Sequence, residues 1–217
     1  MSWKAFIRRG VNLDGTFRCT LMCPNCPRQF VFTDFGKKVP GKDIDMKSFK
    51  KIIKYFTEIN FEGQYSDPVH HPKFIEMIQM CLGNNVRVEV QHASAAKPYD
   101  WYIKAFKANP KAHWRFSIDG LPSNSHIYRI HQDAPKLFKV MKDSVKYLEK
   151  KPLWQYIVFK YNEHNIEKAQ EMAQRDGIYF LTIQSSRWRK RDGKDDPLKP
   201  SDKYALKNRM DDREKNW

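Results

Sequence analysis

The chain has 217 residues and a mass of 25.9 kDa, the size of one domain with at most a short tail. Its 41% apolar residues are enough for a core, which argues against a wholly disordered chain. The sequence has no apolar run long enough for a transmembrane helix, and its four cysteines are too few for a disulfide-stapled scaffold. Its first residues contain no long apolar stretch, so we expect no secretory signal.

The charge is strongly basic, with 40 Lys and Arg against 25 Asp and Glu, a net charge of +15. The excess lies at the ends: residues 1–60 carry +7 and 187–217 carry +4, against +1 for 61–120 and +3 for 121–186. A basic surface accelerates association with anionic partners such as nucleic acid or an acidic peptide. We interpret most of these charges, however, as ordinary solvated surface residues. The densest basic run is Arg187 to Arg191, where Trp188 could stack on a base or simply be exposed.

Helical and extended patterns alternate through the first half of the chain. Phe49, Ile52, Ile53 and Phe56 have helical spacing, and Val86, Val88 and Val90 alternate with polar residues as in a strand. In chain order we expect a strand near 5–13, a helix at 45–59, a strand at 60–64, a helix from Pro72 to Leu82, a strand at 86–91 and a helix at 98–108.

The second half continues the alternation. Trp114, Phe116 and Ile118 alternate with polar residues, which predicts a strand with one apolar face. The expected elements are a strand at 114–119, a helix at 135–150, a strand at 154–160, a helix at 165–175, a strand at 179–184 and a last charged helix at 201–215.

Repeated strand–helix units predict a parallel α/β sheet, because each crossover returns the chain to the same edge. About six units fit either an open doubly wound sheet or a partial barrel. Both folds place their chemistry at the carboxyl ends of the strands. The segments expected to converge there are 19–26, 64–68, 92–94, 117–120, 160–162 and 184–187.

Three of the four cysteines, Cys19, Cys23 and Cys26, are spaced C-x3-C-x2-C. Three thiolates in so short a loop can ligate a metal ion or an iron–sulfur cluster. A structural zinc site usually needs a second ligand pair, and the sequence has none. The fourth thiol, Cys81, lies among Met77, Ile78 and Leu82 and is expected to be buried packing. Three protein ligands leave one position open, which favours catalysis.

This loop after the first strand resembles the signature of the radical S-adenosylmethionine (SAM) enzymes. The resemblance implies that Cys19, Cys23 and Cys26 bind a [4Fe-4S] cluster that chelates SAM. Reductive cleavage of SAM would yield a 5′-deoxyadenosyl radical that abstracts hydrogen from a substrate. It also implies an electron donor such as flavodoxin or ferredoxin and a reducing cytoplasmic setting. The fold it implies is a partial (β/α)6 barrel with parallel strands over residues 1–187, followed by a charged tail over 188–217.

Further segments carry the resemblance to the cofactor contacts. Gly63 to Pro68 stands where the family has a Gly-Gly-Glu-Pro-like loop for the methionine amino group, although here it contains Gln-Tyr-Ser-Asp-Pro. Phe116 to Gly120 looks like the family's fourth strand, and Arg129 is placed like the arginine near the methionine carboxylate. The expected cofactor-binding residues are Gln64, Tyr65, Ser66, Asp67, His92, Ser117, Asp119, Arg129, Lys160 and Asn162.

Two alternatives remain open from the sequence. The chain could be a metal-stabilised nucleic-acid-binding protein without catalysis, which the net charge and the Arg187 to Arg191 run would suit. It could also be a cluster-binding relative that has lost activity. The substrate is not readable, although the basic surface favours an anionic one, either nucleic acid or an acidic protein segment. We expect no membrane partner, and no auxiliary cluster because no cysteine follows Cys81.

Overall fold

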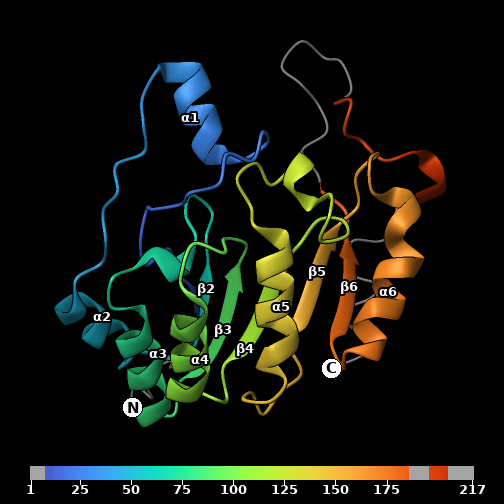
Figure 1. The fold of residues 1–217 in the computed structure, drawn as a ribbon. Helices are drawn as coiled ribbons and strands as arrows, with labels where there is room; N and C mark the ends of the chain where they lie inside the picture. Colours follow the sequence, from blue (N-terminus) through green and yellow to red (C-terminus); the bar gives the residue numbers. More distant parts are fainter. Residues whose placement is uncertain (1–7, 186–195, 205–217) are drawn as a thin grey trace, which may run out of the picture.

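The computed structural model describes residues 8–185 and 196–204 and contains one sheet of six parallel strands in the order β1-β2-β3-β4-β5-β6 (Figure 1). The strands are β1 (Arg8–Asn12), β2 (Phe56–Glu62), β3 (Arg87–His92), β4 (His113–Ser117), β5 (Leu153–Ile157) and β6 (Tyr179–Ile183). Within the described residues β1 and β6 are the two edges of the sheet. The predicted parallel α/β sheet is therefore confirmed, as an open sheet and not a closed barrel.

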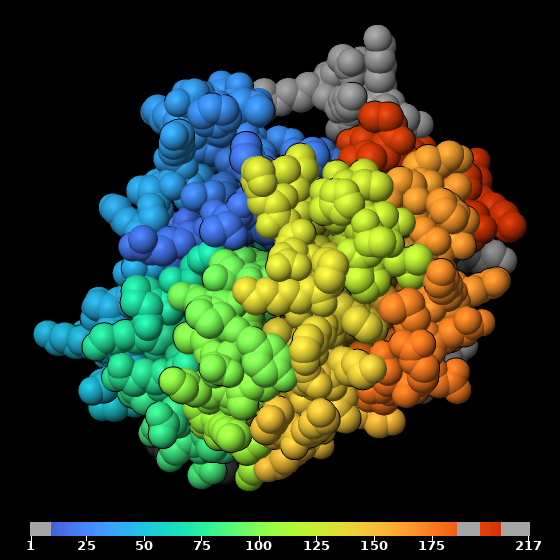
Figure 2. Space-filling view, in the orientation of Figure 1, coloured from blue at the N-terminus to red at the C-terminus, as the bar shows by residue number. Residues whose placement is uncertain are grey.

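Helices fill the crossovers between the strands. They are α1 (Pro27–Phe35), α2 (Met46–Ile52), α3 (Phe74–Gly83), α4 (Tyr99–Ala108), α5 (Ala134–Ser144) and α6 (Ile166–Arg175). In Figure 1, α3, α4 and α5 lie in front of the sheet, whereas α1 stands apart beyond its upper edge. The space-filling view in Figure 2 shows the same helices packed into one continuous body below α1.

The core lies between the sheet and the helices because successive residues of a strand face opposite sides. Trp114 and Phe116 of β4 are fully buried, and both contact Phe106 of α4, with ring centroids 4.9 and 6.5 Å away. The intervening residue Arg115 faces the other side, where it forms an ion pair with Glu89 of β3 at 2.5 Å. The sheet thus presents an apolar face to the helices and a polar face to the interior of the partial barrel.

The predicted helix over 45–59 is wrong in its second half. Helix α2 ends at Ile52, and Phe56 begins β2, four residues before the predicted strand over 60–64. Phe56 has the spacing of a fourth helical contact, but it pairs with Arg8 in the parallel ladder between β1 and β2. Backbone pairing with a distant strand therefore overrides the local periodicity.

The other boundaries differ less, with two exceptions. Helix α5 ends at Ser144, six residues before the prediction. Residues 201–204 are the described part of the predicted last helix, and within them only 202–204 form a helical turn, of the 3-10 type; residues 205–215 lie outside the described residues. Helix α1 is not predicted from the sequence, because none of its nine residues is buried and the segment lacks an apolar stripe.

Residues 196–204, which the sequence assigns to the charged tail, pack on the globular body. Both Ser201 donors reach the Glu163 carboxylate, at 2.7 Å from the backbone N–H and 3.0 Å from Oγ. Asn25, in the cysteine loop, donates its Nδ2 to Asp196 Oδ2 at 2.7 Å. This part of the tail therefore helps to hold the cysteine loop. The basic run Arg187 to Arg191, with Trp188, lies outside the described residues.

Among the described residues, no helix is both long enough and apolar enough to cross a membrane.

Candidate active site

The carboxyl ends of the strands surround a cavity of about 290 Å³, where the topology predicts a site. All three clustered cysteines, Cys19, Cys23 and Cys26, line it from the loop between β1 and α1. The expected cofactor contacts that also line it are Gln64, Ser66, Asp67, His92, Ser117 and Arg129. Tyr65, Asp119, Lys160 and Asn162 do not line the cavity.

The cysteine loop holds its thiols on the cavity side. Cys23 is 7% exposed, and Cys26 is the residue that precedes α1. Burial raises the pKa of Cys19 to about 12 and raises the pKa of Cys23, so both thiols are protonated at neutral pH without a ligand. Binding a metal or cluster would release these protons.

The described residues contain no group of three or more His, Cys, Asp or Glu side chains already placed around a metal ion. The donor set nevertheless suits an iron–sulfur cluster, since three thiols from one short loop line a single cavity and thiolates are the usual ligands of such clusters. An iron with an open coordination position would then face the cavity.

A buried ion pair stands beside Cys23. The carboxylate of Asp119 is fully buried and accepts from Arg129 Nε at 2.7 Å and from the Ile157 N–H at 2.8 Å. Burial raises the pKa of both Asp119 and Cys23, and the charge of Arg129 opposes the rise in each case. Asp119 therefore does not contact the cavity itself but fixes a positive charge at its wall.

The loop after β2 is positioned at the cavity by hydrogen bonds from residues that the sequence analysis does not identify. Asp14 Oδ1 accepts from the Gln64 N–H at 3.0 Å and from Ser66 Oγ at 2.9 Å. Arg28, in α1, donates to the carbonyl of Tyr65 at 3.2 Å, while the Tyr65 side chain is exposed. These contacts join segments 37 to 52 positions apart in sequence, which is why no local pattern reveals them.

Gly63 allows the tight turn of this loop. A Cβ at position 63 would lie 1.8 Å from the backbone oxygen of Ser66, far inside van der Waals contact. Gly63→Ala is expected to displace residues 64–66 and to weaken at least tenfold the binding of SAM, the ligand that the sequence resemblance implies, as measured by equilibrium dialysis. Gly83→Ala is the matched control, because a Cβ there meets no atom within 4 Å. Equal SAM affinities of the two variants would contradict a role for the loop.

The Asp67 carboxylate is used within the protein. Its Oδ2 accepts from the N–H groups of Ala93 and Ser94 at 2.8 and 2.7 Å, and its Oδ1 from that of Val69 at 3.2 Å. A carboxylate with three backbone donors fixes the loops after β2 and β3 relative to each other. Asp67 thus acts as a positioning residue at the cavity wall.

His92 and its neighbour Gln91 face opposite sides of β3. The His92 ring packs among Tyr102, Trp114 and Phe116 on the helix-covered face, with ring centroids 5.7, 5.3 and 4.7 Å away. Gln91 lies on the polar face and lines the cavity, although it is not among the expected contacts. The alternation of β3 contains this information, since Gln91 shares a face with Glu89.

Ser117 lies on the polar face of β4 and is nearly fully buried. Gln155 of β5 reaches it with Nε2 3.4 Å from Ser117 Oγ. The buried Gln132 donates to the carbonyls of Ser117 and Ala93 at 2.9 and 2.6 Å, and so joins the ends of β3 and β4. Gln132 and Gln155 are polar groups of the site that the sequence analysis misses.

The two expected contacts after β5 have other partners. Asn162 is buried and closes the turn, since its Oδ1 accepts from the Phe159 N–H at 2.7 Å and its Nδ2 donates to the Ile157 carbonyl at 3.0 Å. Lys160 is exposed, with Nζ 3.4 Å from Glu163 Oε1. In this structure both side chains shape the turn and lie outside the cavity.

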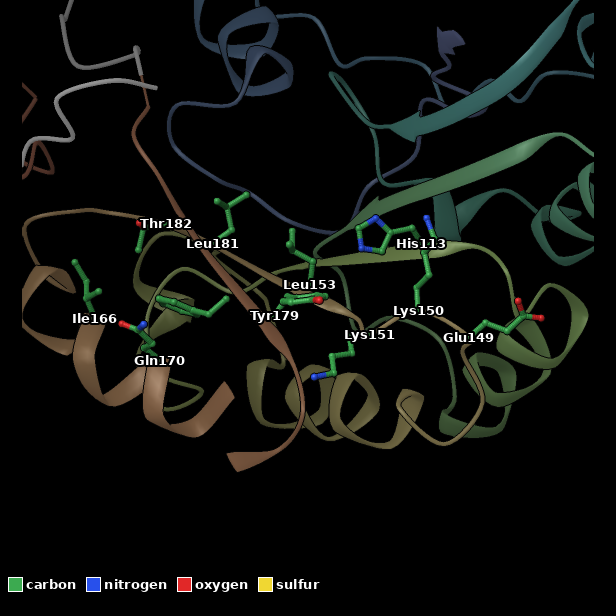
Figure 3. Close-up of a pocket in the computed structure, with 11 residues that line it drawn as sticks. His113, Glu149, Lys150, Lys151, Leu153, Ile166, Gln170, Tyr179, Leu181 and Thr182 are labelled. Atoms are coloured by element: carbon green, nitrogen blue, oxygen red, sulfur yellow. The ribbon is translucent and has the colours of Figure 1, made fainter. Parts of the chain in front are cut away.

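A second cavity of about 600 Å³ lies at the opposite end of the strands (Figure 3). It is lined by the first residues of three strands, His113, Leu153 and Tyr179, and by Gln170 of α6. The cysteines do not line it, and amino ends of parallel strands are not where such folds place their chemistry. The smaller cavity is therefore the candidate site.

No protein-family model matches the sequence, and no curated protein matches it either. Solved structures do share the fold. SuiB of Streptococcus suis bound to the precursor peptide SuiA aligns with a TM-score of 0.68 at 12% identity over 83% of this chain. The structure of anSMEcpe with bound AdoMet aligns with a TM-score of 0.62 at 12% identity over 84%. Methylornithine synthase (PylB) aligns with a TM-score of 0.59 at 11% identity over 91%.

The alignments cover only part of those proteins, namely 40% of SuiB, 52% of anSMEcpe and 60% of PylB. All three are radical SAM enzymes. Sequence identities this low establish a common fold and not a common activity. With its open six-stranded parallel sheet and its cysteine loop after β1, this chain has the radical SAM fold.

Proposed function

We propose that the chain is a radical SAM enzyme in which Cys19, Cys23 and Cys26 hold a [4Fe-4S] cluster and SAM occupies the 290 Å³ cavity. One observation carries the proposal: three thiols of one loop line the cavity at the carboxyl ends of the strands. The support from the fold is that SuiB and anSMEcpe, which share it, have been solved with bound SAM.

The cavity wall offers a partner for each end of SAM. Arg129 would bind the methionine carboxylate, since its charge lies beside Cys23. The backbone carbonyls of residues 63–66 would accept from the ammonium group, and Ser117 with Gln155 would bind the ribose hydroxyls. When bound and reduced, the cluster supplies the electron that cleaves SAM to the 5′-deoxyadenosyl radical. The buried walls would protect this radical from water.

The partners follow from the same chemistry. The proposed enzyme needs a low-potential electron donor such as flavodoxin or ferredoxin, and it would work in a reducing cytoplasm. Two proteins with this fold were solved with a peptide bound, SuiB with SuiA and anSMEcpe with the Cp18Cys peptide. Together with the net charge of +15, they support an acidic protein or peptide segment as the substrate.

Anaerobic reconstitution tests the proposal. We expect a brown protein with about four iron and four sulfide per chain, which forms 5′-deoxyadenosine only when both SAM and dithionite are present. A colourless zinc protein that binds nucleic acid would instead favour the nucleic-acid-binding alternative. A protein that holds the cluster but makes no 5′-deoxyadenosine would be a relative without activity.

A further inference from the structure

Apolar side chains are exposed around the cysteine loop. Of the ten large apolar side chains that are exposed in the described residues, five lie on this loop, on α1 or against them: Met22, Phe30, Phe32, Phe35 and Ile130. The Met22 N–H donates to the Ile130 carbonyl at 3.1 Å, which joins the two loops. We call these five residues the α1 surface. Phe32 and Phe35 lie three residues apart on α1 and therefore share one side of the helix, and exposed apolar groups that share a side usually mark an interaction site.

Helix α1 has no covering element among the described residues. None of its nine residues is buried, and Phe35 is 68% exposed at its end. In Figure 1 it stands beyond the carboxyl ends of the strands, and the residues that line the cavity come from this end of the sheet. An isolated helix of nine residues is not stable in water on its own, so a partner that packs on it would stabilise it.

The α1 surface lies on the outer side of the cysteine loop. Cys23 is buried and lines the cavity, whereas its neighbour Met22 is 48% exposed and does not. A molecule bound to the α1 surface would therefore approach the cysteine ligands from outside without entering the cavity. This suits a protein that delivers an electron, since a substrate must reach the cavity itself.

The charge around α1 indicates an acidic partner. Residues 18–42 contain five basic residues and one acidic residue, Asp34; Arg18 is paired with Asp43 at 3.0 Å and Arg28 donates to backbone carbonyls, which leaves the three lysines as the charges of this rim. Lys37, Lys38 and Lys42 follow α1 and are all exposed. A basic rim around apolar residues steers an acidic protein to the surface and makes the encounter salt-dependent.

We propose that the α1 surface is the docking site of an acidic electron-transfer protein, with apolar contacts at Phe32 and Phe35 and charge contacts at Lys37 and Lys38. The inference rests on the proposed radical SAM function, because only that function requires an electron at the cysteine loop. It places the electron donor and the substrate on opposite sides of that loop.

Binding of flavodoxin to the reconstituted holoprotein tests this docking site. The double variant Phe32→Ser/Phe35→Ser is expected to bind flavodoxin at least tenfold more weakly in biolayer interferometry at low salt. Its dithionite-driven formation of 5′-deoxyadenosine should stay at the wild-type level, since dithionite needs no docking. Tyr55→Ser is the control, because Tyr55 is 69% exposed just before β2 and lies outside the α1 surface.

A charge-reversal pair tests the basic rim. Lys37→Glu/Lys38→Glu should weaken flavodoxin binding and reduce its salt dependence. Lys50→Glu/Lys51→Glu on α2 changes the net charge equally, but at another place on the protein. A similar loss in both pairs would indicate only a general charge effect and would contradict a docking rim at α1.

Three results would overturn the docking proposal: wild-type protein that does not bind flavodoxin, a Phe32/Phe35 variant that binds as tightly as wild type, or sedimentation data showing that the α1 surface joins two copies of this chain. Binding does not require SAM cleavage. A wild-type protein that binds flavodoxin but forms no 5′-deoxyadenosine with dithionite would therefore count against the proposed function and not against the docking site.

Discussion

Replacing Cys23 with alanine is expected to abolish iron retention and to bring 5′-deoxyadenosine formation below detection. Cys23 is 7% exposed, lines the cavity and lies beside the charge of Arg129, which favours its thiolate. Two remaining thiols would leave a second iron of the cluster without a protein ligand. Iron and sulfide analysis after anaerobic reconstitution, together with chromatography of the reaction products, measures both effects.

Cys81→Ala is the matched control for this variant. Cys81 is fully buried in α3 and belongs to the main core, as the sequence predicts. Its loss removes packing and should cost about 1 kcal/mol of unfolding free energy, while iron content stays at the wild-type value. Full iron in Cys23→Ala, or equal iron loss in both variants, would contradict the assignment of the cysteine loop as the ligand set.

Asp119→Asn is expected to lower the free energy of unfolding by about 3 kcal/mol, because it leaves a largely buried guanidinium without its counter-charge. Asp119 is fully buried and the Arg129 side chain is 15% exposed. The expected loss lies at the low end of the usual range for a broken buried ion pair because Arg129 faces the cavity, where water can solvate it. Urea unfolding followed by circular dichroism measures the change.

An exposed ion pair provides the comparison. Lys73 and Glu76 on the surface of α3 lie 3.8 Å apart, with both side chains more than half exposed. Glu76→Gln should change the unfolding free energy by less than about 0.5 kcal/mol. Comparable destabilisation by the two substitutions would show that Asp119 and Arg129 are solvated. It would contradict the assignment of this pair as a fixed charge at the cavity wall.

Elements with a complete local pattern were predictable from the sequence. Strand β3 and helices α4 and α6 lie within a residue or so of their expected positions, since one face of each is apolar at the correct spacing. The junction between α2 and β2 was not predictable, because Phe56 satisfies a helical spacing and a strand pairing equally well. Only the ladder with β1 decides between them.

The site divides in the same way. The cysteine loop was predictable because its three thiols are close in sequence and its spacing is distinctive. Asp14, Gln132 and Gln155 were not, because each acts through a partner brought near by folding, such as Asp14 with Ser66 or Gln132 with Ala93. His92 is among the expected contacts and Gln91 is not, whereas the sheet turns the Gln91 side chain and not the His92 ring to the polar face.

The sequence by itself determined the parallel α/β class, the clustering of three cysteines and the burial of Cys81, since each depends on residue type and short-range spacing. Tertiary structure decided which polar residues reach the cavity and which are used only within the fold, as Asp119 and Asn162 are. It also decided that residues 196–204 belong to the body and that α1 remains uncovered by other described residues. These features depend on contacts between distant segments, and the free energy of such contacts is not encoded in any local pattern.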